Sequence, residues 1–455
     1  GLGRLIEAEA SYNQAIAFKT DYAEAHSNLG NTLQGLGRLS EAEASFNQAI
    51  VLRPDYAEAH NNLGLAFAEL GKLTQAEASF YQAIALKPHY ADAYNNLGVS
   101  LQGLGRLKEA ETNFNQAIAL EPDHAEAHNN LGGTLRGLGR LSEAEASFTE
   151  ALALNPDYSE AQHNLISLLT IYTSQNKSSQ PIARVHQQIR EFDSKEKIFG
   201  IISDNKTIDL INKTSDIVRE NNLDLETSNS QIYRRNSVDL NCDRHMAIFD
   251  AFNIIPEFCF GCYKVQVEPR SLLELVKLSV VFDQIKLSGN NTRKCMIEIR
   301  PFVPGFYKGL IYCNGLSEAY QIAEKLEIIV EERIGSRLPL TVKRGCSEYP
   351  ISFPDYKKIN KSGAQPMNYN REWASIEKEY DAKQPIKNQM IVSPTLSSLS
   401  LSDVLIFRNW IDYARGIGDS SVLLLDHSEI GSQEMYEIAK SRLETYPWLQ
   451  SAGPV

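Results

Sequence analysis

The sequence predicts a helical-repeat solenoid followed by an α+β domain and a helical tail. Three observations lead to this prediction: residues 1–171 repeat with a period of 34, residues 263–344 alternate between strand and helix patterns, and the remainder is loop-rich with amphipathic helices. The expected divisions are a solenoid at 1–171, a linker with helical segments at 172–236, an α+β domain at 237–350 and a loop-rich tail with helices at 351–455.

Composition is that of a multidomain globular protein. The chain has 455 residues, of which 43% are hydrophobic and 22% charged, so it is too long for one core. No run of about 18 apolar residues occurs, and residues 1–22 lack the pattern of a signal peptide. We therefore expect a cytoplasmic protein without a membrane span, although the chain starts at Gly1 inside a repeat, which leaves an upstream targeting signal untested.

Negative charge is concentrated in the repeats. Residues 1–170 contain 21 Asp and Glu against 10 Lys and Arg, whereas the rest of the chain contains 36 against 35. Phosphate binding needs a basic surface, so the repeats are not expected to bind nucleic acid. The charge favours a neutral or basic polypeptide partner, and the alternative is that it only keeps the array soluble.

The repeat is marked by a Gly-basic-Leu element and by a proline. The element occurs at Gly3-Arg4-Leu5, Gly37-Arg38-Leu39, Gly71-Lys72-Leu73, Gly105-Arg106-Leu107 and Gly139-Arg140-Leu141. The prolines are Pro54, Pro88, Pro122 and Pro156. Since proline cannot continue a helix, each proline is expected to end one helix pair before the next begins.

The residues within one unit resemble the tetratricopeptide repeat family. In the unit 57–90, the positions that this family fills with small and large packing residues are Leu63, Gly64, Phe67, Ala76, Phe80, Ala83 and Pro88. Small Gly64 and Ala76 would let two helices approach, while the larger side chains fill the space between them. Four full repeats are expected between residues 23 and 158, which is enough to bury a continuous core.

An asparagine recurs at one position of the first helix in each unit. The residues are Asn28, Asn62, Asn96, Asn130 and Asn164. Asparagine is an unfavourable choice inside a helix, so it is expected to have a role there. A carboxamide has one donor group and one acceptor, which match a peptide unit, so a ladder of asparagines could clamp an extended backbone. The alternative is that these side chains bond between neighbouring repeats.

This ladder, with the surrounding Ala-Glu-Ala-His-Asn-Asn-Leu-Gly sequence, is similar to the repeats of O-linked N-acetylglucosamine transferases. The resemblance implies that the five asparagines line a concave peptide-binding surface. It ends with the repeats, because nothing after residue 171 resembles the nucleotide-sugar-binding domains of that family. The transferase activity is therefore not expected, and the C-terminal half resembles no family that we recognise.

Residues 263–344 predict a strand, helix, strand, strand, helix and strand in that order. The expected strands are 263–267, 294–300, 309–313 and 340–344, and the helices are 271–287 and 317–335. This βαββαβ order is that of the ferredoxin-like arrangement. Further helices are expected near 182–195, 206–220, 371–381, 402–415 and 432–444.

All six cysteines lie between Cys242 and Cys346. In the expected sheet, Cys259, Cys262, Cys313 and Cys346 converge on one edge, and four thiolates there would suit zinc or an iron–sulfur cluster. Cys295 shares strand parity with Ile297, which favours a place in the core. The alternatives for the four are a thiol–disulfide pair at Cys259-x-x-Cys262 or buried thiols that pack as small hydrophobic groups.

No recognised catalytic motif occurs in the sequence, so an enzyme is the less favoured prediction. The favoured one is an interaction scaffold that binds an extended polypeptide in the groove of its repeats, coupled to a domain of unknown activity. The alternatives are an enzyme or redox protein whose cysteine-bearing domain acts on a protein delivered by the repeats, and an oligomerisation module.

Overall fold

The computed structural model describes residues 2–174, 180–195, 200–235, 240–300, 303–346, 348–383, 395–425 and 431–445. These residues divide into two compact units. The described chain up to Leu165 belongs to the first unit, and the second contains the described residues from Ile166 to Ala382 and from Thr395 onward.

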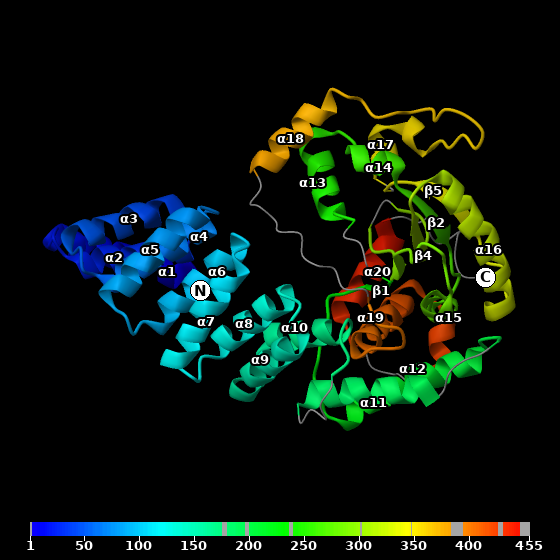
Figure 1. Ribbon diagram of the computed structural model, residues 1–455, viewed down its shortest axis with the longest axis horizontal. Helices are drawn as coiled ribbons and strands as arrows, with labels where there is room; N and C mark the ends of the chain where they lie inside the picture. Colours follow the sequence, from blue (N-terminus) through cyan, green and yellow to red (C-terminus); the bar gives the residue numbers. More distant parts are fainter. Residues whose placement is uncertain are drawn as a thin grey trace. The chain divides into compact units, whose positions relative to one another are not determined.

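The first unit is a succession of helices joined by short turns (Figure 1). The helices are α1 (Leu2–Phe18), α2 (Ala23–Gly35), α3 (Leu39–Leu52), α4 (Ala57–Glu69), α5 (Leu73–Leu86), α6 (Ala91–Gly103), α7 (Leu107–Leu120), α8 (Ala125–Gly137), α9 (Leu141–Leu154) and α10 (Ser159–Leu169), of which the last continues into the second unit. Each complete repeat is one first helix of 13 residues and one second helix of 14. The predicted solenoid of helical repeats is confirmed.

The Gly-basic-Leu element forms the turn inside each helix pair. The four glycines Gly37, Gly71, Gly105 and Gly139 have φ between +73° and +77°, a region that favours glycine. The following basic side chain reaches the preceding repeat, as Arg106 Nη1 does when it lies 2.7 Å from Glu77 Oε1. The equivalent pairs are Arg38–Glu9, Lys72–Glu43 and Arg140–Glu111. The element therefore combines a turn with an ion pair between repeats.

A second glycine brings the two helices of a pair together. Gly98 of α6 faces the ring of Phe114 on α7, and a Cβ at Gly98 would lie 2.6 Å from Phe114 Cε1. The same contact recurs between Gly30 and Phe46, Gly64 and Phe80, and Gly132 and Phe148. All four phenylalanines are fully buried. Close packing of this kind leaves no room for even a methyl group.

The first helices lie on the inner side of the curved array. Successive first helices contact each other directly, α2 with α4, α4 with α6 and α6 with α8, whereas the main contacts of each second helix are with first helices. Helices that are closer together mark the shorter side of a curved stack. The first helices therefore line the concave face, which in repeat proteins is the extended binding surface.

The second unit is an antiparallel sheet with helices (Figure 1). Its strands are β1 (Gln231–Arg234), β2 (Tyr263–Val267), β3 (Arg293–Ile297), β4 (Tyr307–Cys313) and β5 (Leu340–Arg344). Its α-helices are α11 (Pro181–Lys195), α12 (Asp204–Glu220), α13 (Cys242–Phe252), α14 (Glu257–Gly261), α15 (Leu272–Gln284), α16 (Leu316–Ile334), α17 (Tyr349–Ser352), α18 (Trp373–Lys383), α19 (Leu401–Ile417) and α20 (Gln433–Thr445). Two short 3-10 helices are η1 (Pro354–Lys357) and η2 (Ser420–Leu424).

The strands lie in the order β1-β3-β4-β2-β5, and each neighbouring pair is antiparallel. Tyr263 is opposite Cys313 on β4 and opposite Arg344 on β5, while Cys295 is opposite Gly309. The strands, helices and their order between residues 263 and 344 agree with the prediction from periodicity. Strand β1 was not predicted.

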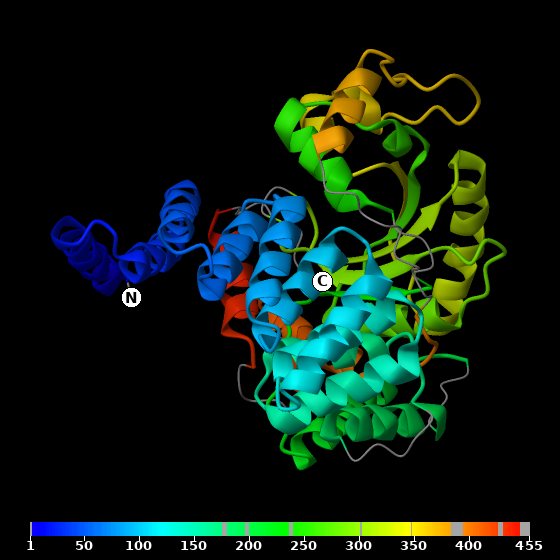
Figure 2. The same cartoon turned by 60° about the vertical axis from the view of Figure 1, so that its left-hand side comes forward.

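Helices α15 and α16 cover one face of the sheet, and α16 lies beside the strands in both views (Figure 1 and Figure 2). A Cβ at Gly309 would collide with Leu278 and Phe282 of α15, which identifies the covered face. Because side chains alternate along a strand, Val265, Cys295 and Ile311 point to the same face. Cys295 lies in this core, as its strand parity predicts.

Helix α19 is buried on almost all sides, unlike the amphipathic tail helix expected at 402–415. Its Trp410 and Tyr413 are fully buried, and Trp410 Nε1 donates to Ser230 O at 2.9 Å. At its N-terminus Ser400 and Asp403 form a capping box, and Asp403 also pairs with buried Arg234 at 3.0 Å. Among the described helices, none is long and apolar enough to cross a membrane.

Candidate functional site

The predicted asparagine ladder lies on the first helices, along the concave face. Asn28 is exposed, and Asn62, Asn96, Asn130 and Asn164 are partly exposed. The residue three positions after each asparagine is uncharged. These residues are Asn31, Leu65, Val99, Gly133 and Ser167. The asparagine is therefore constant along the first helices, whereas the residue three positions later changes from repeat to repeat.

The ladder amides bond between neighbouring repeats through their Nδ2 groups. Asn96 donates to Asn61 Oδ1 at 3.1 Å, and Asn130 donates to Asn95 Oδ1 at 3.0 Å. The last of the series, Asn164, donates to Asn129 Oδ1 at 2.9 Å. The sequence left this bonding open as the alternative to ligand binding, and the structure has it at three of the five positions.

Carboxylates set the orientation of these amides. Asn95 Nδ2 donates to Glu126 Oε1 at 3.0 Å, and Asn129 Nδ2 donates to Glu160 Oε1 at 3.2 Å. An ionised carboxylate can only accept, so the nitrogen of Asn95 must face Glu126 and its oxygen must face Asn130. The side-chain nitrogen of Asn130 is then directed to Asn95, so Oδ1 of Asn130 is the side-chain group that this bond leaves unused. The bonds among the described residues leave Oδ1 of Asn96, Asn130 and Asn164 as acceptors.

The histidines next to the ladder support the helices. Nε2 of His60 lies 3.1 Å from Pro54 O, and Nε2 of His128 lies 3.0 Å from Pro122 O. These bonds tie the first helix to the turn before it. His26 makes the same contact with Thr20 O at 3.2 Å.

The cysteines of the second unit lie at one edge of the sheet and in the adjoining core. Cys259 is buried against two tyrosines, and its Sγ lies 3.3 Å from Tyr349 Oη. Cys313 ends β4, and Cys262 packs on the side chains of Met296, Leu310 and Tyr312. Cys346 Sγ lies 3.7 Å from Lys264 Nζ. All six cysteines are described, and none is in a disulfide.

Burial raises the pKa of Cys259 and Cys313 to about 12, so these thiols are protonated at neutral pH. Binding of a metal would have to release these protons. In the part of the chain that the structure describes, no three His, Cys, Asp or Glu side chains are placed to hold a metal ion. The zinc or iron–sulfur site at Cys259, Cys262, Cys313 and Cys346 stays a prediction.

A group of lysines on the sheet was not singled out by the sequence. Lys264, Lys294, Lys308 and Lys343 come from four different strands and point to the face opposite α15, and we call them the lysine face. The available signal was a lysine of the same parity in three of the four predicted strands, with Lys308 directly before the remaining one. It was missed because charged residues in strands are usually solvated, whereas Lys264 and Lys308 are only 4% and 2% exposed.

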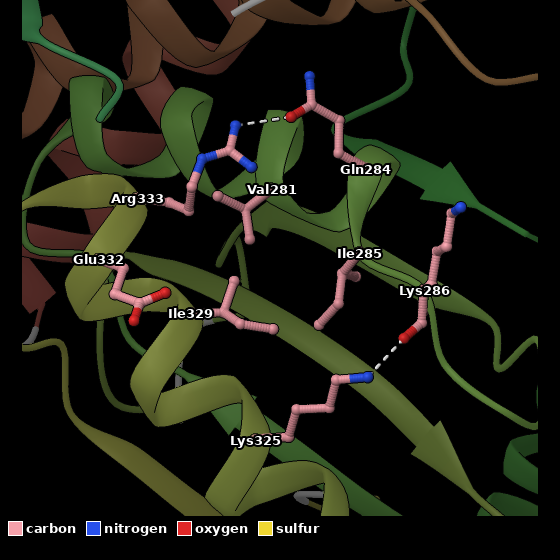
Figure 3. A pocket seen from close by; sticks show the side chains of 8 residues that line it. All are labelled: Val281, Gln284, Ile285, Lys286, Lys325, Ile329, Glu332 and Arg333. Atoms are coloured by element: carbon pink, nitrogen blue, oxygen red, sulfur yellow. Dashed lines mark hydrogen bonds between the residues drawn. The ribbon is translucent and has the colours of Figure 1, made fainter. Parts of the chain in front are cut away.

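A hollow between α15 and α16 is a weaker candidate (Figure 3). Arg333 Nη2 donates to Gln284 Oε1 at 2.6 Å, and Lys325 Nζ donates to Lys286 O at 2.8 Å. The side chains of Arg333 and Lys325 are thus already bonded within the hollow, and its apolar lining is limited to Val281, Ile285 and Ile329. We assign no function to it.

Comparison with known proteins identifies the repeats. Residues 1–198 match the family model described as the cilia and flagella-associated protein 70 C-terminal domain. The N-terminal array consists of tetratricopeptide repeats. The match covers less than half of the chain, so nothing specific to that protein is transferred to this one. No curated protein matches the sequence.

Among solved structures, the tetratricopeptide repeat array is similar to several repeat proteins. MamA is 28% identical over 34% of this chain and 90% of its own, with a TM-score of 0.32. TTC0263, a thermophilic TPR protein of Thermus thermophilus, is 27% identical over 37% of this chain and 92% of its own, with a TM-score of 0.33. YrrB, described as a TPR protein with an unusual peptide-binding site, is 20% identical over 46% of this chain and 93% of its own, with a TM-score of 0.31.

Proposed function

We propose that the tetratricopeptide array is an interaction scaffold that binds an extended segment of another polypeptide in its concave groove. In this proposal, Oδ1 atoms of the asparagine ladder accept hydrogen bonds from backbone N–H groups of the segment. The observation that carries the proposal is the fixed orientation of the ladder, in which Nδ2 of Asn96, Asn130 and Asn164 is held by the preceding repeat.

Orientation before binding lowers the cost of binding. A free asparagine side chain would have to be ordered when the peptide arrives, whereas these side chains are already held by neighbouring repeats. Backbone recognition also makes the groove tolerant of peptide sequence. Selectivity would then come from the variable neighbours such as Leu65 and Val99, and from the negative charge of the array, which favours neutral or basic segments.

The test compares two matched triple variants of the full chain. One replaces Asn96, Asn130 and Asn164 with alanine, and the control replaces Asn13, Asn47 and Asn115, which are exposed on second helices. A binding peptide is first selected from a synthetic array, and its affinity is measured by fluorescence polarisation. Each net hydrogen bond contributes about 0.5–1.5 kcal/mol, so the loss of three should weaken binding by the ladder variant about 10- to 2,000-fold, whereas the control should bind normally.

A chemically altered peptide separates backbone recognition from a loosened array. N-methylation of alternate peptide bonds removes donors that the ladder would bind, so it should weaken binding to the wild type and not to the ladder variant. Thermal unfolding of both triple variants shows whether the repeats remain intact. Equal affinity of the ladder variant and the wild type for the unmethylated peptide would refute the proposal.

For the second unit, we propose a ferredoxin-like core formed by β2, α15, β3, β4, α16 and β5. The support is the strand order β5-β2-β4-β3 with antiparallel neighbours, together with the contacts of α15 with β3 and β4 and of α16 with β2 and β5. In this proposal β1 is an additional edge strand beside β3. A crystal structure of the full chain with another strand order would contradict it.

A further inference from the structure

The lysine face places positive charges from neighbouring strands close together. Lys264 of β2 is directly opposite Lys343 of β5. On its other side, Lys264 is opposite Tyr312 of β4. Lys294 of β3 is opposite Leu310, which is two residues before Tyr312 on β4. The electrostatic influence of Lys264 acts on both Lys343 and Lys294. Like charges that are half-buried or buried repel each other strongly, because little water separates them.

The described partners of two of these lysines are a thiol, a carboxamide and aromatic rings rather than carboxylates. Lys264 Nζ lies 3.7 Å from Cys346 Sγ and 4.9 Å from the centre of the Tyr312 ring. Lys294 Nζ donates to Gln231 Oε1 at 3.1 Å and lies 5.6 Å from the centre of the Tyr233 ring. By contrast, Lys308 is paired with buried Glu298 at 2.7 Å.

Burial and neighbouring positive charges lower the pKa of Lys343 and of Lys294, which disfavours their charged forms. The pKa of Lys343 is lowered to about 7, first by burial and then by Lys264, Lys308 and Arg300. The pKa of Lys294 is lowered to about 8 by burial, Lys264 and Arg300. An anion bound beside them would restore the charged form of both, since an opposite charge favours ionisation.

The side chain of Gln266, on the same face of the sheet, has a buried oxygen that accepts no hydrogen bond from the described residues. Gln266 of β2 follows Lys264 at the next position of that face and is 7% exposed. Its Nε2 donates to Glu268 Oε1 at 2.5 Å, which fixes the orientation of the amide. Among the described residues, its Oε1 has no hydrogen-bond partner. A buried acceptor of this kind is costly unless a ligand or water satisfies it.

We propose that the lysine face binds the phosphate group of a small phosphate ester through Lys264, Lys294 and Lys343, with Gln266 Oε1 accepting from a hydroxyl group of the same ligand. Phosphate is favoured over carboxylate because a compact divalent anion can be shared by several ammonium groups, each of which acts as a point charge.

A small ligand is favoured over nucleic acid. The chain after residue 170 has 36 acidic and 35 basic residues, so the second unit has no net positive charge to attract a polyanion. The lysine side chains are also half-buried or buried, and this limits access to a short anionic group. Some exposed surface remains at Lys294 and Lys343, and also at Cys242, Cys262 and Cys346.

The test is isothermal titration calorimetry of the full chain with inorganic phosphate and with glycerol 3-phosphate. Saturable binding of both is expected, with glycerol 3-phosphate the tighter ligand because it supplies hydroxyl groups. Lys264→Met keeps the side-chain length and removes the charge, and it should weaken both ligands at least tenfold. Lys325→Met removes a lysine from α16, on the other side of the sheet, and should leave both affinities unchanged.

Two further variants keep the test decisive. Lys294→Met should reproduce the loss if Lys264→Met fails to fold, as judged from thermal unfolding. Gln266→Leu should remove the preference for glycerol 3-phosphate and retain phosphate binding. The proposal is overturned if the wild type binds neither ligand at millimolar concentration, if the lysine variants bind normally, or if a short single-stranded oligonucleotide binds more tightly than glycerol 3-phosphate.

Discussion

At the scale of single residues, two adjacent glycines in α8 have opposite surroundings. A Cβ at Gly132 would lie 2.6 Å from Phe148 Cε1, whereas a Cβ at Gly133 would meet only Gln102 Nε2, at 3.7 Å. The first is a packing requirement of every repeat. The second is a glycine in a helix with space beside it, where alanine is the better helix former.

Gly132→Ala should therefore lower the free energy of unfolding by about 1–3 kcal/mol, because it overpacks the contact with Phe148. Gly133→Ala should raise it by about 0.5–1 kcal/mol through the lower entropy of the unfolded chain. Urea unfolding followed by circular dichroism measures both. Similar effects of the two substitutions would show that the contact between glycine and phenylalanine is not the cause.

At the scale of secondary-structure elements, α19 depends on polar groups at its N-terminus. Buried Arg234 of β1 pairs with Asp403 at 3.0 Å and with Asp283 at 3.1 Å, while Ser400 caps the helix. These bonds connect a short edge strand to a helix more than a hundred residues later in the chain. The edge strand and the helix are therefore expected to be lost together.

Ser400→Ala should cost about 1 kcal/mol as the loss of a helix cap. Asp403→Ala should cost about 3–5 kcal/mol, because it also leaves the Arg234 charge buried with one carboxylate fewer. The double variant Arg234→Met/Asp403→Leu should recover much of that loss, since it removes both charges. Chemical denaturation of these variants and of the single variants Arg234→Met and Asp403→Leu tests this, and strictly additive effects at Arg234 and Asp403 would contradict it.

The same elements show what sequence patterns could and could not predict. Strands β2 and β5 have the predicted ends because alternation and flanking loops are local signals. Strand β1 lies in a polar stretch and pairs only with β3, some sixty residues away, so no local signal indicates it. The positions of the ladder asparagines follow from the repeat period. Their bonds to Asn61, Asn95 and Asn129 depend on how neighbouring repeats pack, which a period alone does not reveal.

At the scale of the whole molecule, charge is divided unequally along the chain. The first 170 residues have an excess of 11 acidic residues, from 21 against 10, whereas the remainder is nearly neutral. An acidic array attracts basic segments over distances of about 10 Å at ordinary ionic strength. Attraction of this kind acts mainly on the rate of association.

Binding of a basic peptide to the full chain should therefore weaken several-fold when the salt concentration is raised from low to near molar values, with most of the change in the association rate. Surface plasmon resonance with a basic peptide and a neutral peptide of equal length measures this effect. The neutral peptide serves as the control and should respond little to salt. An equal response of both peptides would mean that the acidity of the array does not contribute to recognition.

The bonds from the ladder amides to Asn61, Asn95 and Asn129 of the preceding repeats each span 35 residues, one more than the repeat. Each unit therefore completes the polar contacts of the unit before it and offers the same opening to the unit after it. Duplication of an entire unit within the gene would preserve every such bond, whereas insertion of a partial unit would break the series. The array can thus lengthen by copying without a new interface, and evolution can lengthen the recognised segment in equal steps.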